Sequence, residues 1–325
     1  MEGRGALRRE GSVALIERRV PHPAADRLFR SAAGLCAFSL LLLLLLLVVT
    51  LAWKSLPAAR AFGAGFIWSD AWNPVIGAYG ALSSIYGTLV STLIALLIAM
   101  PMSLVIAFFL VELAPPAVSN PVGAAIELLA AVPSIIYGMW GLFVFAPLMS
   151  RYLQPALARL GGGVPLFAGA PMGIGILTAG LILALMILPF MTAVIRDVFV
   201  LVPPVVKEAA YGLGATKWEV ARQVTLRYGL RGVIGAGVLG LGRAIGETMA
   251  VTFVIGNEHR LSSSLFAPGN TIASTLANEF SEASDPLYVS SLVSLGAILL
   301  VISVGIQWVA HSWLARVERS TGGWR

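Results

Sequence analysis

Residues 31–53 read SAAGLCAFSLLLLLLLLVVTLAW, a run of 23 residues without a charged side chain. A helix that crosses the hydrocarbon core of a bilayer needs about 20 mostly apolar residues, so this stretch predicts a membrane-spanning helix. It is also longer than the apolar core of a secretory signal peptide, which reaches about 15 residues. We therefore expect a retained membrane anchor and not a cleaved leader.

The rest of the chain has the same character. Of its 325 residues, 58% are hydrophobic and 12% are charged, and its mean hydropathy is +0.87. The charged share is about half that of an ordinary soluble domain, which excludes a soluble globular enzyme. Uncharged windows of membrane length recur and predict an all-α membrane protein with six transmembrane helices. The predicted spans are Ser31–Trp53, a helix ending at Val111 within residues 71–111, Leu128–Met149, Met172–Ile195, Gly232–Gly256 and Pro286–Leu314.

The basic residues indicate how these spans are oriented. Of the 22 Lys and Arg residues, 16 lie in segments on the side of the two termini, and 5 lie in the loops of the other side. Positive residues mark the cytoplasmic face, so we expect the two termini and residues 196–231 to be cytoplasmic. The basic residues form no separate domain, which argues against nucleic-acid binding. The predicted external loops are 54–80, 150–171 and 257–285.

The sequence offers no metal site or catalytic centre. Cys36 is the single cysteine, and His22, His259 and His311 are far apart and match no ligand spacing. His-Glu-x-x-His and Gly-x-Ser-x-Gly motifs are absent, so an intramembrane enzyme is disfavoured. We expect no catalytic residue, no metal and no cofactor.

One predicted cytoplasmic loop is rich in helix-forming residues. Residues 207–227 read KEAAYGLGATKWEVARQVTLR, in which Gly212 and Gly214 interrupt the helical pattern. This predicts two short helices at an angle, with Trp218, Ala221 and Val224 on one side of the second. That side would suit a groove on another protein, and a helix lying on the lipid surface is the alternative.

The same loop resembles the Glu-Ala-Ala motif of ABC importer permeases. Glu208, Ala209, Ala210 and Gly214 match the motif in register, and Arg227 stands where the family has a proline. The resemblance implies the type I (MetI-like) permease fold, with this loop docking into a separate ATPase subunit. The chain has no Walker A sequence, so ATP hydrolysis would be supplied by a partner.

The resemblance divides the chain into three parts. Residues 1–30 form an Arg-rich cytoplasmic arm, residues 31–315 the six-span permease domain, and residues 316–325 a cytoplasmic tail. The role of the arm is left open.

The fifth predicted span contains two charges. Arg243 and Glu247 are four residues apart and would share one face of a continuous helix. A charge at mid-membrane costs at least about 2.5 kcal/mol, so the pair needs a reason, either structural neutralisation or a polar lining for a transported ion. We favour the second, because a guanidinium can bind a tetrahedral oxyanion with two hydrogen bonds. Gly242 and Gly246 form a Gly-x-x-x-Gly pair typical of close helix packing.

Residues 241–257, LGRAIGETMAVTFVIGN, resemble the permeases of phosphate-specific ABC importers. The resemblance implies that inorganic phosphate passes Arg243, and it implies four further subunits. These are a sister permease, two copies of an ATPase subunit and an external phosphate-binding protein. A permease for sulfate or molybdate remains an alternative, as do a stand-alone channel and a secondary transporter. Further stretches that support the resemblance are residues 85–90, 112–115, 132–138, 268–272 and 276–280.

Overall fold

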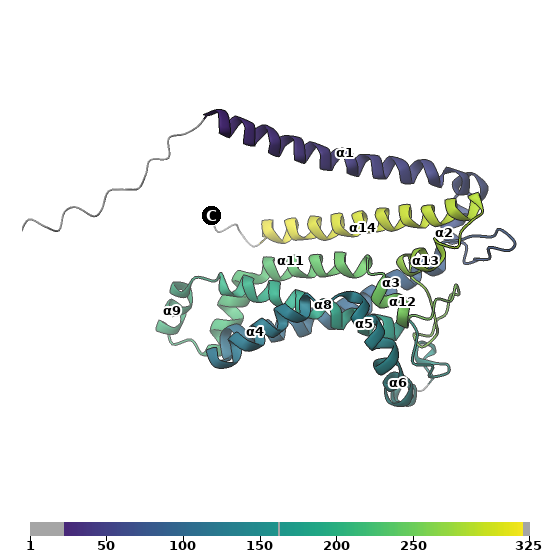
Figure 1. Cartoon of the computed structure of the whole chain (residues 1–325). Coiled ribbons are helices and arrows are strands. Elements are labelled where there is room, and N and C mark those ends of the chain that lie inside the picture. The colour runs from purple at the N-terminus through teal and green to yellow at the C-terminus, as the bar shows by residue number, and fades with distance from the viewer. Residues whose placement is uncertain (1–22, 162, 321–325) are drawn as a thin grey trace, which may run out of the picture. The chain divides into compact units, whose positions relative to one another are not determined.

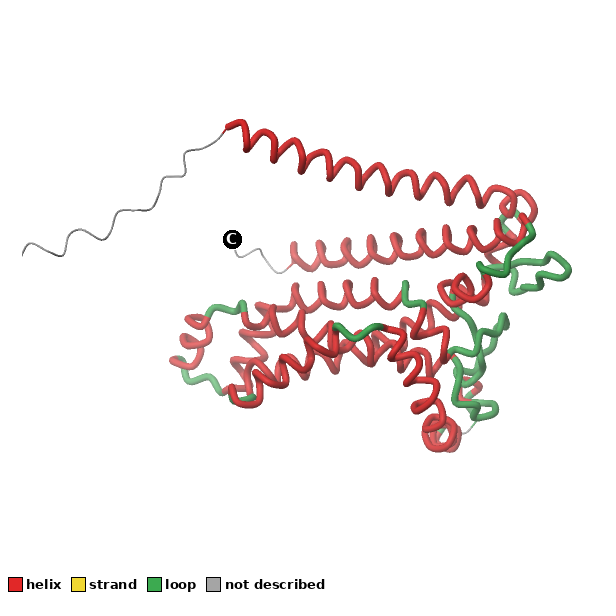
Figure 2. The backbone as a smooth tube through the Cα atoms, viewed as in Figure 1, coloured by secondary structure: helices red, strands yellow, loops and turns green. Residues whose placement is uncertain are grey.

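The computed structural model describes residues 23–161 and 163–320. Within these ranges the regular structure is helical, and the only extended pairings are two isolated β-bridges, Asn73 with Ala78 and Gly256 with Gly269 (Figure 2). Most of the predicted N-terminal arm, residues 1–22, lies outside the described residues. The all-α prediction is confirmed.

The helices follow one another with short connections. In chain order they are α1 (Pro23–Phe62), α2 (Gly65–Trp68), α3 (Leu82–Phe108), η1 (Phe109–Leu113), α4 (Pro116–Ala130), α5 (Ser134–Trp140), η2 (Gly141–Phe145), α6 (Ala146–Leu148), η3 (Met149–Leu153), α7 (Gln154–Leu160), η4 (Pro165–Phe167), α8 (Ile176–Val200), α9 (Pro204–Gly212), α10 (Lys217–Glu219), η5 (Val220–Thr225), α11 (Leu226–Ile245), α12 (Met249–Val254), α13 (Ile272–Glu279) and α14 (Pro286–Ser320). The segments η1, η2, η3 and η5 are π-helical, and η4 is a 3₁₀ turn.

The chain forms two units, residues 1–50 and 51–325, and α1 passes from the first into the second. In the first unit α1 is mostly apolar on all sides from Ser31 onward, as expected for a helix surrounded by lipid. It begins at Pro23, eight residues before the predicted span. The acidic Asp26 lies in its first turn, where the helix dipole favours a negative charge.

Four helices are long and apolar enough to cross a membrane, which confirms four of the six predicted spans. They are Asp26–Phe62, Leu82–Leu113, Ile176–Val200 and Pro286–Arg316. The other two predicted spans are broken, and each break has a local cause.

The predicted span Leu128–Met149 is wrong as a single helix. Its first residues belong to α4, the chain breaks after Ala130, and the helical stretch from Ser134 to Leu160 leaves at an angle of 91°. Pro133 explains the break, because a proline lacks the N–H that continues a helix and disfavours helical geometry in the residue before it. The bent pair forms either one broken span or a re-entrant loop.

The predicted span Gly232–Gly256 is also interrupted. Helix α11 begins earlier, at Leu226, and ends at Ile245, and the short α12 begins only at Met249. Gly246 follows the last residue of α11, and glycine has a low helix propensity. The window is therefore two helices joined by a turn.

Helix α8 lies at the centre of the second unit and packs against α3 along its length. Gly180 permits the close approach, because a Cβ atom there would lie 2.7 Å from Cγ2 of Ile94. The hydroxyls of Ser103 and Thr192 both donate to the carbonyl of Leu188, directly before Pro189. Hydroxyls of this kind satisfy backbone groups around a proline in a membrane helix.

The last turns of α1 are fixed to α14 in a similar way. The Ala58 N–H donates to Oγ of Ser290 at 2.9 Å, and the same hydroxyl donates to the Lys54 carbonyl at 2.9 Å. The Ser290 hydroxyl therefore bridges the Ala58 N–H and the Lys54 carbonyl, next to Pro57 inside the helix. An inserted side chain and a proline are the usual causes of a local helix distortion.

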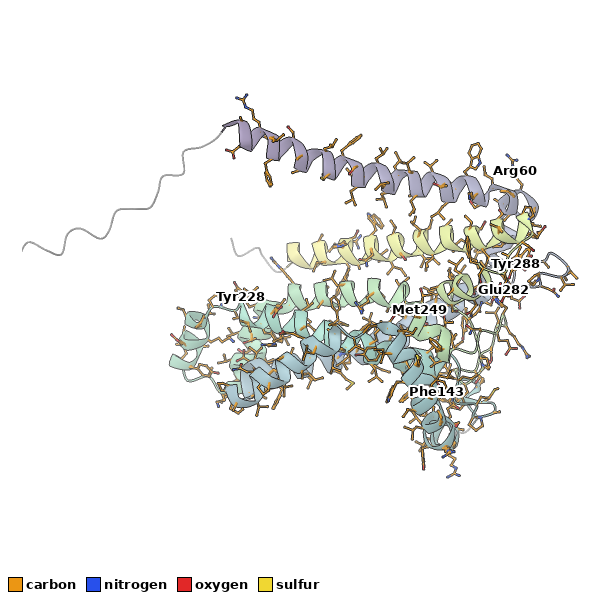
Figure 3. The ribbon with its side chains drawn as sticks, in the orientation of Figure 1. Arg60, Phe143, Tyr228, Met249, Glu282 and Tyr288 are labelled. Atoms are coloured by element: carbon orange, nitrogen blue, oxygen red, sulfur yellow. The ribbon has the colours of Figure 1, made fainter. Side chains whose placement is uncertain are left out.

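The second unit has two opposite ends, which α3, α8 and α14 connect (Figure 1). We call one the α9 end and define it as residues 109–119 and 202–225. The other is the α13 end, residues 69–81 and 256–288, where α13 and the longer loops gather. Tyr228 lies near the first end and Tyr288 at the second (Figure 3).

Candidate coupling and translocation sites

Helix α9 is the first of the two helices predicted in the loop 207–227. Pro204 occupies its first turn, where a missing N–H costs nothing. The helix ends at Gly212, and Gly214 follows with a φ of +87°, which glycine adopts without strain. The predicted break at these glycines is confirmed. Leu213, between them, is 90% exposed.

The second predicted helix is not short. It begins at Lys217, behind a capping box in which Thr216 and Glu219 bond each other's backbone N–H groups. It then continues through η5 into α11 without a break at Arg227. An arginine keeps the backbone N–H that the family's proline lacks, so the helix has no stop signal there. Hydrogen bonds from the Thr216 backbone and hydroxyl lower the pKa of the Glu219 carboxyl.

The apolar face predicted on this second helix is only partly exposed. Trp218 is 65% exposed and its ring meets Phe108 edge to face, with the centroids 6.2 Å apart. Ala221 is 1% exposed, so the prediction that it faces another protein is wrong. The helix turns this residue inward because it runs straight on into the packed α11.

The exposed surface lies on α9 instead. Glu208, Ala209 and Gly214 are exposed, and Ala210 is half-buried. Tyr211 and Leu213 add apolar surface beside them. Four of the motif residues and two exposed apolar side chains therefore share one short helix and its C-terminal turn, at one end of the second unit (Figure 1).

A buried carboxylate holds α9 to the rest of the chain. The Lys207 ammonium donates to Oε1 of Glu112 at 2.6 Å, and the Thr225 hydroxyl donates to the same oxygen at 2.7 Å. The Glu112 side chain is 8% exposed. Glu112 lies in a stretch that supports the family resemblance, but the sequence pattern does not predict this cluster. An isolated acid directly after an apolar span, in a chain with few charges, was the available signal.

Arg243 lies in the last turn of α11, and its side chain is exposed. Its guanidinium carbon is 5.6 Å from the ring centroid of Phe190 on α8, within cation–π range. Within residues 23–161 and 163–320, no carboxylate lies within ion-pair distance of this guanidinium. Its hydrogen-bond donors are therefore available to an anion.

Glu247 does not share a helix face with Arg243, and that prediction is wrong. Helix α11 ends at Ile245, so the four-residue spacing no longer places the two side chains one above the other. Oε1 of Glu247 instead accepts a hydrogen bond from the Ala250 N–H at 3.1 Å. The carboxylate thus satisfies a free N–H at the start of α12, where the helix dipole favours a negative charge.

The two glycines of the Gly-x-x-x-Gly pair differ. A Cβ atom on Gly242 would lie 2.4 Å from Nε2 of Gln307, so this glycine permits the close approach of α11 and α14. At Gly246 the nearest such atom is 4.0 Å away, in its own helix. Of these two glycines, only Gly242 therefore fits the expected role in close helix packing.

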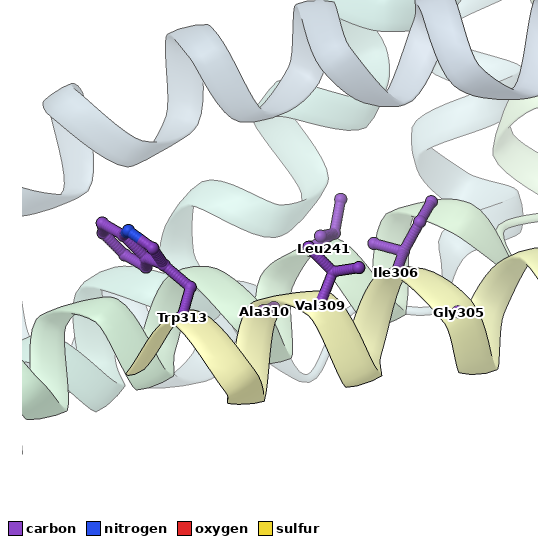
Figure 4. Close-up of a pocket in the computed structure, with 6 residues that line it drawn as sticks. All are labelled: Leu241, Gly305, Ile306, Val309, Ala310 and Trp313. Atoms are coloured by element: carbon purple, nitrogen blue, oxygen red, sulfur yellow. The ribbon is translucent and has the colours of Figure 1, made fainter. Parts of the chain in front are cut away.

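An open groove lies between α11 and α14 (Figure 4). Its lining is almost entirely apolar and has no charged side chain, so it is not a candidate for the ion's path. The residues that line it are Leu241, Gly305, Ile306, Val309, Ala310 and Trp313. In the described part of the chain, no group of three or more His, Cys, Asp or Glu side chains is placed to hold a metal ion.

The α13 end contains a second carboxylate cluster, which the sequence pattern does not predict. The Glu279 carboxylate accepts hydrogen bonds from Nε1 of Trp72 at 2.7 Å and from the Tyr288 hydroxyl at 2.7 Å, and it pairs with Nε2 of His259 at 2.6 Å. The His259 ring stacks on Trp72, and its Nδ1 contacts Asn270 at 2.8 Å. Burial alone would raise the pKa of the Glu279 carboxyl, but these hydrogen bonds and the charge of His259 bring it below its usual value.

Residues 73–319 match the family described as the inner membrane component of binding-protein-dependent transport systems. This is well over half of the chain. The chain therefore belongs to this family of multi-pass membrane permeases, whose members are transport subunits and not enzymes. Such subunits work together with the other components of an ABC transporter, an ATPase and a binding protein.

The curated relatives are named for phosphate transport. The phosphate transport system permease protein PstC of Mesorhizobium japonicum is 51% identical over 301 residues, covering 91% of this chain and 92% of the relative. PstC of Pasteurella multocida is 50% identical and covers 94% of this chain and 96% of its own length. PstC 2 of Mycobacterium tuberculosis is 40% identical, with coverages of 90% and 92%.

A solved structure supports the fold. A chain of a bacterial alginate ABC transporter, crystallised with its alginate-bound periplasmic protein, has a TM-score of 0.61 to this chain. The match covers 90% of this chain and 96% of that chain at 16% sequence identity. The likeness confirms the predicted ABC importer permease fold.

Proposed function

We propose that this chain is the permease subunit of an ATP-driven phosphate importer and forms half of the translocation path for inorganic phosphate. The observation that supports this most strongly is the near 50% identity, over more than nine tenths of the chain, to permeases named for phosphate transport. In this proposal the membrane is the bacterial inner membrane, with the termini and the α9 end in the cytoplasm. The excess of basic residues in those segments supports that orientation.

In this proposal the chain forms only half of the translocation path, and ATP is hydrolysed by a separate subunit, so further subunits are needed. A sister permease of the PstA type would supply the other half, and two PstB-type ATPase subunits would lie beneath. A PstS-type phosphate-binding protein would dock on the external loops 54–80, 150–171 and 257–285.

Arg243 is the proposed contact for phosphate along the path. Its guanidinium is exposed, lies over an aromatic ring and has no carboxylate partner among the described residues. A planar fork of donors fits two oxygens of a tetrahedral oxyanion, and a positive charge offsets the loss of hydration as the anion leaves water. Glu247 lies in the adjacent turn and holds the start of α12, so in this proposal it shapes the break beside Arg243.

The α9 surface is the proposed coupling site for the ATPase. The exposed Glu208, Ala209 and Gly214, with Trp218 nearby, form a short helical projection that a cleft can receive. When the ATPase subunits close on ATP, they would displace α9 and rock the packed helices between two states, a rigid-body form of switching. Phosphate delivered by the binding protein would then pass Arg243.

Phosphate uptake by the assembled importer in vesicles tests the proposal. Arg243→Gln should abolish ATP-dependent uptake and leave assembly intact, because glutamine keeps much of the volume but not the charge. Arg231→Gln, an exposed arginine on the same helix, is the matched control and should transport normally. Uptake that is retained in Arg243→Gln would refute the role of Arg243.

Uptake measurements in the same vesicles distinguish a phosphate importer from a sulfate or molybdate permease, a channel and a secondary transporter. Unlabelled phosphate should compete with labelled phosphate, and sulfate and molybdate should not. Uptake should also require ATP and the ATPase subunits. Competition by sulfate or molybdate, or uptake without ATP, would contradict a phosphate-specific ABC importer.

A further inference from the structure

Helix α9 has few attachments to the helices that surround the proposed path. Among the described residues, the Lys207 ammonium makes the only side-chain hydrogen bond that α9 forms with another element. The rest of α9 is mostly exposed. A movement of α9 can therefore reach the membrane helices through Lys207 and its partner, through the packing of α9 against η5, or through the backbone connections at either end.

The partner, Glu112, is placed to transmit such a movement. One of its oxygens accepts from Lys207 at 2.6 Å and from Thr225 at 2.7 Å. Glu112 belongs to η1, the continuation of α3, and Thr225 belongs to η5, which runs into α11. A single carboxylate oxygen thus joins α9 to α3 and to the helix that carries Arg243.

The local backbone supports a functional role for this junction. Both η1 and η5 are π-helical, and π-helical turns inside α-helices are uncommon and occur frequently at functional sites. Phe108 and Trp218, in edge-to-face contact, connect the same two helices close by. The junction therefore has a specific geometry in addition to a charge.

Burial distinguishes this ion pair from an ordinary surface pair. The side chains of Glu112 and Lys207 are 8% and 19% exposed, whereas Glu127, which pairs with Arg196 at 2.9 Å, is 61% exposed. Surface pairs contribute little, but removal of one member of a buried pair leaves an uncompensated charge. Glu127 therefore offers a matched control for Glu112.

We propose that Glu112 is the positioning residue that couples α9 to the membrane helices: its carboxylate holds Lys207 and Thr225 together, so that displacement of α9 moves α3 and α11 with it. This inference rests on the proposed coupling function of α9. It assigns to a residue outside the Glu-Ala-Ala motif the transmission of the movement inside the permease.

The functional test measures phosphate uptake and ATP hydrolysis together in vesicles with the complete importer. Glu112→Gln removes the charge with little change in size, and it should lower phosphate transported per ATP by about fivefold or more, the lower range of coupling between distant sites. Glu127→Gln should leave the ratio unchanged. The charge-swapped double variant Glu112→Lys with Lys207→Glu should recover most of it, which a general loss of folding would not allow.

A second measurement does not depend on the transported ion. Hydrogen exchange of α9 in the assembled complex should be faster in Glu112→Gln than in the wild type, should be unchanged in Glu127→Gln and should slow again in the double variant. Unchanged exchange of α9, together with an unchanged transport ratio in Glu112→Gln, would overturn the proposal.

Two further outcomes are distinguishable. If the wild-type complex imports no phosphate, the proposed function fails, whereas hydrogen exchange still tests the link between α9 and Glu112. If Glu112→Gln does not assemble, Thr225→Val removes one of the two donors and keeps the ion pair. That variant should give a smaller loss of coupling and faster exchange of α9, and wild-type values for both would overturn the proposal.

Discussion

At the α13 end, the Glu279 carboxylate forms hydrogen bonds with three separate segments, through the side chains of Trp72, His259 and Tyr288. At the α9 end, the Glu112 carboxylate holds one ammonium and one hydroxyl. The first cluster also includes two pairs of stacked rings. The ring centroids of Tyr79 and Tyr288 are 5.3 Å apart, and those of Trp72 and His259 are 5.0 Å apart. Beyond Lys207, α9 has no side-chain bond to another element among the described residues.

This difference indicates a division of mechanical roles. A partly buried network with several donors is cooperative and resists local opening, whereas a short exposed helix with one ion pair has little to hold it. The loops at the α13 end are therefore built as a fixed surface. At the α9 end a small helix can be displaced, and the contact between Lys207 and Glu112 links its movement to the helices inside. The following predictions test this contrast, from the largest expected effect to the smallest.

Glu279→Ala should have the largest effect on stability. It removes the common acceptor of three donors from the partly buried centre of the cluster, and a buried donor left without a partner costs about 1–3 kcal/mol. Thermal unfolding of the purified complex should show a lower Tm. Glu282→Ala, an exposed acid three residues later, is the control and should unfold as the wild type does. Equal stability of the two variants would contradict a fixed α13 end.

Gly214→Asp should impair coupling. Gly214 has a positive φ, so aspartate strains the backbone there, but no atom lies within 4 Å of a Cβ and the new charge lies on the docking surface. We expect about a tenfold loss of co-purification with the ATPase, which corresponds to about 1.4 kcal/mol. Gly63→Asp adds the same residue at another positive φ with open space, outside α9, and should bind the ATPase normally. Equal behaviour of the two variants would refute docking at Gly214.

Acid should loosen the α13 end through Glu279. Its pKa is lowered in the folded chain, so the unfolded chain binds the proton more tightly and protonation favours unfolding. The stabilisation is fully present above the ordinary glutamate pKa of about 4.3 and is lost as the pH falls through the lowered value. Hydrogen exchange of residues 69–81 and 256–285 should rise in that range. Glu279→Gln should remove this part of the pH dependence, and a persisting acid transition of the same size would contradict it.

Thr216→Ala should give the smallest effect. It removes the capping box at the start of α10, and loss of a helix cap costs about 1 kcal/mol. Hydrogen exchange should increase in residues 216–225 and remain unchanged at the α13 end. Faster exchange throughout the chain would show that the two ends do not open separately.

The sequence predicted the spans whose apolar runs are unbroken. A helix such as α8 is specified by local composition. In lipid there is no water to bond the backbone N–H and C=O groups, and an apolar segment can satisfy all of them by forming a helix. The two broken spans could not be recognised by counting uncharged residues. In the first, Pro133 interrupts the helix, and in the second α11 ends at Ile245, directly before Gly246.

The candidate site was predicted in part. The Glu-Ala-Ala residues lie on an exposed short helix, as a pattern of neighbouring residues can indicate, but Ala221 turned inward and Glu247 left the helix of Arg243. Glu112 and Glu279 were not predicted. The two partners of Glu112 are 95 and 113 residues away in the sequence, and Trp72, which donates to Glu279, is 207 residues away from it. No local pattern connects residues at such separations.

The sequence by itself determined that this protein is a helical membrane protein, that it resembles ABC importer permeases, and which short motifs carry the proposed coupling and ion contacts. Those properties depend on composition and on spacing within one or two helical turns. Only the tertiary structure decided where the spans break, which motif residues are exposed, and which carboxylates hold the two ends. Such properties arise when distant segments pack together and each buried polar group must find a partner.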